Sequence, residues 1–207
     1  MKRFIITLCL MATFVFFGAL SVSAADDVGQ KTQEYFDALF SKMKIVAEQH
    51  PDAATYRELM RPVAKEIPGF FGGSFVDSNW VIRQVFHPSH FLARGFDLKG
   101  VKELSYFIEK MKTSPGPQLS EPAHGSLVQP RLISLRYPVI DNGKVDGIIS
   151  MFVYTNDFLK NVGLDDARAY RITCLGKVAE ERGKLSESHR TVKVDLPSTE
   201  WVIEYDK

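Results

Sequence analysis

The sequence is poor in cysteine, which excludes one common way of stabilising an exported protein. Cys9 and Cys174 are the only two cysteines in the 207 residues. Cys9 lies within an N-terminal apolar run and follows Leu8, where a lipid-attachment site needs a small residue. The rest of the chain therefore has no internal disulfide. We interpret Cys174 as a small buried hydrophobic residue on a strand, with a reactive or intermolecular thiol as the alternative.

The sequence also lacks an excess of charge of either sign. It has 26 Lys and Arg residues, 25 Asp and Glu residues and a net charge of +1. Cleavage after Ala24 would remove Lys2 and Arg3, leaving 24 basic against 25 acidic residues and a net charge of −1. A balanced surface gives no electrostatic reason to expect a nucleic-acid partner.

Several catalytic patterns are missing as well. The chain has no Gly-x-Ser-x-Gly elbow, no glycine-rich phosphate loop and no Cys-x-x-Cys-His sequence. His87 and His90 are closely spaced, but no second cluster of metal ligands accompanies them. We therefore predict no metal, no cofactor and no enzymatic activity. For His87 and His90 taken by themselves, three interpretations stay open: loop histidines that make hydrogen bonds, residues that face a ligand, or a metal site. The other histidines are scattered along the chain: His50, His124 and His189.

The N-terminus has the organisation of an export signal. Lys2 and Arg3 precede an apolar run from Phe4 to Leu20, and the small residues Val22-Ser23-Ala24 follow. We expect residues 1–24 to be a cleaved signal peptide and the protein to be periplasmic or secreted. An uncleaved membrane anchor is the alternative. No second apolar segment follows, so we expect no attached cytoplasmic output domain.

Helical periodicity dominates the start of the predicted mature chain. Apolar residues recur every three or four positions over 28–49, which predicts one long amphipathic helix. A second helix is predicted over 53–65, before Pro68-Gly69 interrupts helical structure. Helical spacing returns over 99–112. We treat residues 25–67 as an N-terminal helical segment.

From residue 68 onward the pattern is mainly that of strands. Two strands with a tight turn are expected around Ser78-Asn79. Three prolines and two glycines in 113–126 predict a loop. Two extended runs flank Asn142-Gly143, a pair that favours a type I′ hairpin turn. More strands follow, with a hairpin expected at Pro197-Ser198. This order predicts an α+β fold with an antiparallel sheet.

Residues 68–98 resemble the core of CHASE-type sensor domains, in which a Pro-Gly segment leads into paired strands, a proline loop and a Gly-x-Asp-Leu corner. CHASE and Cache domains are related PAS-like extracytoplasmic folds, and the resemblance covers about residues 30–207. The residues that carry it are Pro68-Gly69, Val81-Ile82-Arg83, Pro88, Gly95-Phe96-Asp97-Leu98, Leu119-Ser120-Glu121-Pro122, Tyr137-Pro138-Val139, Gly147-Ile148-Ile149, Phe158-Leu159 and Glu200-Trp201-Val202-Ile203.

The resemblance implies a PAS-like antiparallel sheet over 68–207, with the long N-terminal helix packed against it and a small-molecule pocket beneath covering loops. Residues two apart on a strand share a face, but the sequence leaves open whether the face from Arg131 to Tyr137 meets the pocket or the helix. Arg83, Arg131 and Arg136 are predicted on strands, where an arginine can face water or pair with an anionic group. The implied and inferred ligand-binding residues are Arg83, His87, His90, Ser120, Arg131, Ile133, Leu135, Tyr137 and Ser150.

Two functions follow from these predictions. The first is a periplasmic sensor module that binds a small molecule, which can be anionic, and signals to a separate membrane-bound protein. The second is a structural or protein-interaction module that binds no ligand and acts through its N-terminal helix, for example as a homodimer.

Overall fold

A computed structural model describes residues 27–87, 93–120, 122 and 131–206. The predicted signal peptide and His90 lie outside the described residues. Two helices come first, α1 (Asp27–Ala47) and α2 (Tyr56–Glu66), and they match the predicted positions. Short 3-10 turns at Leu98–Gly100 and Lys102–Leu104 precede α3 (Ser105–Thr113). None of the helices described is long and apolar enough to cross a membrane.

The first sheet has five antiparallel strands in the order β2-β1-β5-β4-β3. Its strands are β1 (Phe70–Asp77), β2 (Ile82–Val85), β3 (Gln118–Leu119), β4 (Leu132–Asp141) and β5 (Lys144–Tyr154). The β4–β5 hairpin turns at Asn142 and Gly143, whose φ angles of 48° and 75° confirm the predicted turn. The predicted loop contains the two-residue edge strand β3, which pairs with β4.

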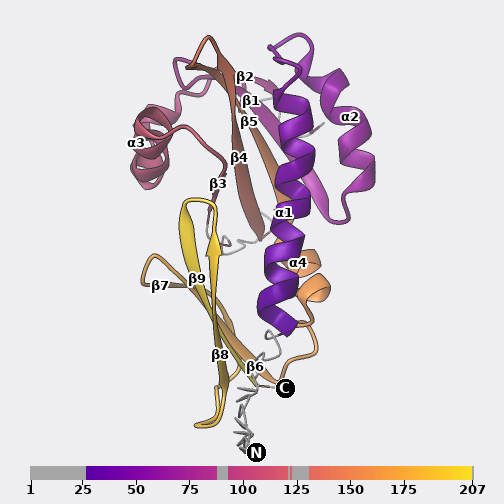
Figure 1. The fold of residues 1–207 in the computed structure, drawn as a ribbon, viewed down its shortest axis with the longest axis vertical. Helices are drawn as coiled ribbons and strands as arrows, with labels where there is room; N and C mark the ends of the chain where they lie inside the picture. The colour runs from indigo at the N-terminus through magenta and orange to yellow at the C-terminus, as the bar shows by residue number, and fades with distance from the viewer. Residues whose placement is uncertain (1–26, 88–92, 121, 123–130, 207) are drawn as a thin grey trace, which may run out of the picture.

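Four further strands form a second antiparallel sheet in the order β7-β6-β9-β8. They are β6 (Ala169–Cys174), β7 (Lys177–Arg182), β8 (Arg190–Leu196) and β9 (Thr199–Asp206). The β8–β9 turn at Pro197-Ser198 is where the sequence predicted it. A helix absent from the sequence prediction, α4 (Thr155–Val162), separates the two sheets along the chain (Figure 1).

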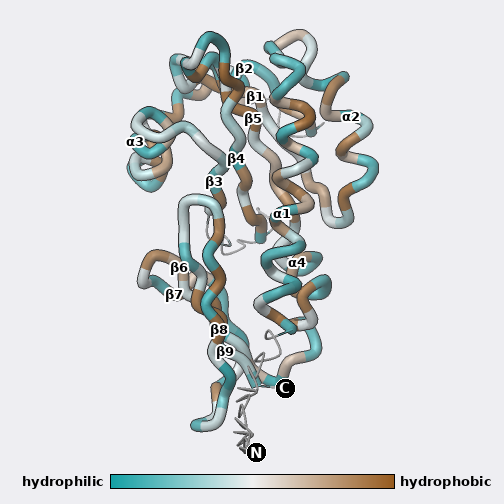
Figure 2. Tube along the Cα trace, in the orientation of Figure 1, coloured by the Kyte–Doolittle hydropathy of each residue, from teal (hydrophilic) through white to brown (hydrophobic). Residues whose placement is uncertain are grey.

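Helix α1 lies along both sheets and contributes apolar side chains to the core that they share (Figure 1). Apolar and polar residues alternate along α1 (Figure 2), and most of its large apolar residues are buried in the main core. Phe36 is fully buried. Its ring centroid lies 5.2 Å from that of Phe158 on α4 and also 5.2 Å from that of Trp201 on β9. The predicted α+β fold, with a long N-terminal helix packed against antiparallel strands, is confirmed, with the addition that the strands divide into two sheets.

Contacts at the turn of β8 and β9 also join the two sheets. The Leu119 amide in β3 donates to the carbonyl of Pro197 over 3.0 Å. The hydroxyl of Tyr106 and the ammonium of Lys110, both on α3, donate to the carbonyl of Ser198 at 3.1 and 3.3 Å. We call these three hydrogen bonds the turn clasp.

Candidate ligand site on the first sheet

The two faces of the first sheet have different chemistry. One face packs against α1 and α2 through apolar side chains such as Phe75, Ile149 and Met151. The opposite face, on the side of α3 (Figure 1), carries polar side chains at its centre. A buried polar row on a sheet needs partners for its hydrogen-bonding groups, so this face is the one to inspect for a ligand.

One row of side chains crosses all five strands on the α3 side. The pairing aligns Gln118 with Arg136, Arg136 with Ser150, Ser150 with Ser74, and Ser74 with Val85. Directly opposite residues have Cβ atoms about 4.5–5.5 Å apart, so these side chains are neighbours. Gln118, Ser150 and Ser74 are each at most 5% exposed. Four consecutive members of the row are therefore polar, and three of them are nearly removed from solvent.

Arg136 is the only arginine in this row. Its Nη1 atom is enclosed and makes no hydrogen bond, and no ion pair joins it to any residue in the described ranges. The guanidinium lies over the ring of Phe107, with Cζ 5.1 Å from the ring centroid. Burial lowers the pKa of Arg136 to about 10, because the charged form has lost water without gaining a carboxylate. Such a cation is poised to bind an anion.

Acceptor and hydroxyl groups lie beside this cation. Gln118 donates from Nε2 to the carbonyl of Phe107 over 3.0 Å, while its buried Oε1 has no hydrogen-bond partner among the described residues. Ser134, two residues before Arg136 and so on the same face, has a buried hydroxyl that is likewise unpaired within the described ranges. We call Ser74, Gln118, Ser134, Arg136 and Ser150 the polar strip.

Two predicted site residues lie next to the polar strip. Ser120 follows Gln118 by two residues, and its hydroxyl donates to the Ser134 carbonyl over 3.1 Å and accepts from the Ser134 amide. At the β2 end of the strip, His87 lies close to Gly72, since a Cβ added to Gly72 would be 3.2 Å from the Cβ of His87. The ring of His87 stacks on the ring of Phe71 with a centroid distance of 4.6 Å. Ser120 and His87 therefore flank the strip to which Ser150 belongs.

Three predicted site residues lie on the other face. Ile133 and Leu135 are fully buried in the core that includes α1, and Tyr137 packs against that core. The residues did share a face, as expected, but the face meets the helix. A ligand could reach Ile133 or Leu135 from that side only by displacing α1, so we leave these three out of the candidate site.

Arg83 and Arg131, the two other arginines predicted on strands, have carboxylate partners. Arg83 Nε lies 2.6 Å from Asp77 Oδ2 in the turn between β1 and β2. Arg131, just before β4, pairs with Glu180 on β7, which is 3% exposed. Among the described residues, Arg136 differs from both because its guanidinium has no carboxylate partner. Whether any of the nine predicted residues contacts a ligand stays a prediction.

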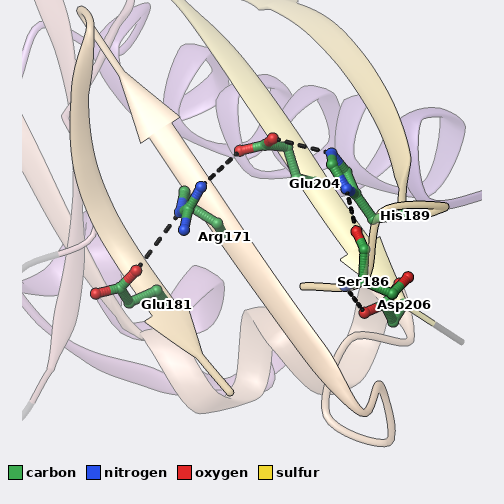
Figure 3. A network of polar contacts seen from close by, with 6 residues as sticks. All are labelled: Arg171, Glu181, Ser186, His189, Glu204 and Asp206. Carbon is green, nitrogen blue, oxygen red and sulfur yellow. Dashed lines mark hydrogen bonds and ion pairs between the residues drawn. The ribbon is translucent and has the colours of Figure 1, made fainter. Parts of the chain in front are cut away.

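A second polar network lies on the outer face of the second sheet (Figure 3). Arg171 lies 3.5 Å from Glu181 and 3.6 Å from Glu204, and His189 Nε2 lies 3.1 Å from Glu204. Most of these side chains are substantially exposed, so the network is typical of a solvated surface. Within the described ranges, no three His, Cys, Asp or Glu residues are grouped to hold a metal.

Sequence reasoning did not select Gln118, Ser134 or Arg136 for the site. Each is an ordinary polar residue on or next to a strand, and only the pairing shows that the strands bring them together. One signal was available: apolar and polar residues alternate in Ile133–Arg136, which puts Ser134 and Arg136 on a polar face of the strand.

No protein-family profile matches the chain, and no curated protein matches it by sequence. Solved structures do match its fold. One is an extracellular ligand binding receptor from Desulfohalobium retbaense, with 20% identity and a TM-score of 0.59. The match covers 86% of this chain and 39% of that one, so this chain spans well under half of the receptor's length.

Two other matches cover nearly the whole of a solved domain. The ligand-binding domain of the Pseudomonas aeruginosa amino acid chemoreceptor PctC, in complex with GABA, has 12% identity and a TM-score of 0.61 over 86% of this chain and 93% of that one. The ligand-binding domain of the Pseudomonas fluorescens chemoreceptor CtaA, in complex with L-serine, has 14% identity and a TM-score of 0.63 over 86% and 91%. The fold is therefore that of Cache-like sensor domains. All three matches are described as ligand-binding proteins.

Proposed function

We propose that this protein is an exported sensor module that binds a small organic anion at the polar strip and signals to a separate membrane-bound protein. The observation that carries the proposal is the enclosed Nη1 atom of the half-buried Arg136, which has no hydrogen-bond partner and no ion pair among the described residues. An anionic ligand would supply what the fold leaves out, since charge-assisted hydrogen bonds to a buried guanidinium are strong.

The composition of the polar strip suggests how such a ligand would be oriented. Its anionic group would meet Arg136 and the hydroxyls of Ser134 and Ser150, while a donor group elsewhere on the molecule would meet the free Oε1 of Gln118. A ligand with one acidic and one hydrogen-donating group fits this arrangement. Small amino acids and hydroxy acids are therefore the first compounds to test.

The fold likeness to chemoreceptor domains supports a role in sensing, and the predicted signal peptide supports an exported location. The likeness to ligand-binding domains of chemoreceptors is also the support for a membrane-bound partner. The alternative of an interaction module acting through α1 has less support. Most apolar residues of α1 are buried within the chain, and Ile45 is the strongly exposed exception in the described helix.

A thermal-shift screen of the protein purified after expression of the full chain tests the proposal. A ligand present at a hundredfold excess over its dissociation constant stabilises the folded state by about 2.7 kcal/mol. We expect stabilisation by at least one class among amino acids, hydroxy acids and other small organic acids, and loss of that response in Arg136→Met. Absence of any shift across these classes would contradict the proposal.

Two variants sharpen this test. Arg136→Met removes an unpaired buried charge, so without ligand the variant should melt at the same temperature as the wild type or higher. Arg83→Met is the matched control, because Arg83 is already paired with Asp77. It should keep the ligand response. If Arg83→Met abolished the response and Arg136→Met kept it, the arginine chosen from the structure would be wrong.

A further inference from the structure

A groove separate from the polar strip lies at the end of the first sheet farthest from the C-terminus. It is lined by the β1–β2 turn, the β4–β5 turn and the last turn of α3, and its volume is about 360 Å³. The three elements converge at this end in Figure 1. Sites for small ligands generally measure about 300–1,000 Å³, so the groove is large enough for a small molecule.

The floor of the groove is apolar. Trp80, Met111 and Ile148 line it, and they belong to a compact cluster that is separate from the main core. Ile148 lies two residues from Ser150 on the same face, and its row across the sheet contains Pro138 and Val76. This apolar row separates the groove from the polar strip. A ligand in the groove would therefore contact different residues from a ligand at Arg136.

The walls of the groove carry positive charge without acidic partners. Lys112 and Lys144 both line it and are exposed, and in the described part of the chain neither forms an ion pair. The ammonium of Lys112 lies 6.0 Å from the centroid of the Trp80 ring. Asp141, across the hairpin from Lys144, does not line the groove and accepts a hydrogen bond from Asn142.

The one carboxylate in the lining, Asp77, is fully engaged by its own turn. It lies 2.6 Å from Arg83 Nε and accepts from the amides of Val81 and Asn79, both at 3.0 Å. Partial burial opposes ionisation of Asp77, but these donors outweigh it and hold the pKa of the carboxyl below its ordinary value. Asp77 therefore stays ionised and neutralises Arg83, so that Lys112 and Lys144 remain available to an anion.

Trp80 has a backbone conformation that is unusual for its residue type. Its φ angle is +67°, in the left-handed region where a turn generally has glycine or asparagine. A bulky residue at such a position is rare, and strained residues cluster at functional sites. Here the conformation places an indole ring on the groove floor, where it can contact an apolar ligand.

From these observations we propose that the groove binds a small carboxylate with an apolar tail. The tail would lie on Trp80, Met111 and Ile148, and the carboxylate would lie between the ammonium groups of Lys112 and Lys144. The proposal does not depend on the polar strip, and a compound could bind at either place without the other.

The two tryptophans in the sequence give a direct test. In a nitrogen-15 NMR titration, the indole signal of Trp80 reports on the groove, while that of Trp201, fully buried in the core, reports on the rest of the fold. Acetate, butanoate and hexanoate serve as probes. We expect the Trp80 signal to shift saturably and the Trp201 signal to stay in place, with affinity rising by up to about fourfold per added methylene.

Charge and position are tested by matched controls. Hexylammonium, which has the same number of carbon atoms and the opposite charge, should not shift the Trp80 signal. The double variant Lys112→Met, Lys144→Met should weaken hexanoate binding at least tenfold, whereas Lys177→Met on the second sheet and Arg136→Met should leave it unchanged. The proposal is overturned if hexanoate does not move the Trp80 signal, if hexylammonium binds as well, or if the double variant binds hexanoate normally.

Discussion

Gly73 lies where β1, β5 and the first residue of α2 come close together, behind the polar strip. A Cβ at this position would lie 2.4 Å from the Tyr56 hydroxyl and 2.5 Å from the Ser150 carbonyl oxygen. The same two groups share a hydrogen bond of 3.2 Å, which a methyl group would force apart. Gly73 is therefore required by space, since its backbone conformation is an ordinary extended one.

We predict that Gly73→Ala lowers the free energy of unfolding by about 1–3 kcal/mol, the usual range for overpacking a buried site. Gly100→Ala is the matched control, because a Cβ there would meet no atom within 4 Å. Urea unfolding followed by circular dichroism measures both. Equal stability of the two variants would show that the close approach at Gly73 relaxes at no cost.

Asp77 should make the stability of the β1–β2 turn depend on pH. Its folded pKa is lower than its unfolded pKa, so its contribution is fully present above the unfolded value of about 3.9 and is lost as pH falls through the folded value. We predict that Asp77→Asn is less stable than wild type at neutral pH and that the difference shrinks below about pH 4. Urea unfolding from pH 7 to pH 3 measures this. A difference that stayed constant with pH would contradict the assignment.

At the scale of elements, the turn clasp joins the candidate site to the second sheet. Gln118 belongs to the polar strip, and the next residue, Leu119, bonds to Pro197 through its amide. Tyr106 and Lys110 lie on the same short helix as Phe107, the residue that stacks on Arg136. On β3, the turn clasp is therefore one residue from Gln118. On α3, it is within one helical turn of Phe107, whose ring lies under the Arg136 guanidinium.

We predict that the double variant Tyr106→Phe, Lys110→Met loosens this attachment without unfolding the protein. Both side chains are at least partly exposed, so the loss of global stability should stay under about 1 kcal/mol. Hydrogen exchange of the Leu119 amide should become faster, because the turn that contains its acceptor, the Pro197 carbonyl, is no longer held by α3 at Ser198. Lys102→Met, in the preceding 3-10 turn, is the control. Unchanged protection of Leu119 in the double variant would show that the clasp does not hold the turn.

Local patterns in the sequence were enough to predict most elements. The three-to-four spacing predicted α1, and Asn142-Gly143 predicted the β4–β5 hairpin, because each signal depends only on neighbouring residues. Helix α4 was missed because its eight residues span barely two turns and directly follow the buried strand β5. The division into two sheets depends on pairing between distant strands, which no local pattern specifies.

The candidate site was predicted only in part for a related reason. Alternation showed that Ile133 and Leu135 share a face, but it could not show which face meets α1. Ser120 and Ser150 came from the family resemblance and lie in or beside the polar strip. Arg136 was considered only as one of three strand arginines. Its distinguishing property is the lack of a partner, which appears only when the surrounding side chains are in place.

At the scale of the whole molecule, an ion pair joins the two sheets in addition to the packing of α1 and the turn clasp. Arg131, at the start of β4, pairs with Glu180 on β7, which also accepts a hydrogen bond of 3.4 Å from the hydroxyl of Tyr170. Glu180 is 3% exposed, while about a third of the Arg131 side chain reaches solvent. Breaking the pair would therefore leave a buried carboxylate without its cation.

We predict that Arg131→Met lowers the free energy of unfolding by about 1–3 kcal/mol, less than a fully buried pair would lose because Arg131 is partly solvated. Arg131→Met, Glu180→Met should regain most of the loss, since replacing both partners removes the orphaned charge. Arg171→Met, which breaks the exposed pairs with Glu181 and Glu204, should cost at most about 1 kcal/mol. Urea unfolding followed by both circular dichroism and tryptophan fluorescence measures all three variants. A double variant as unstable as Arg131→Met would mean that packing of the arginine stem, and not the ion pair, joins the sheets.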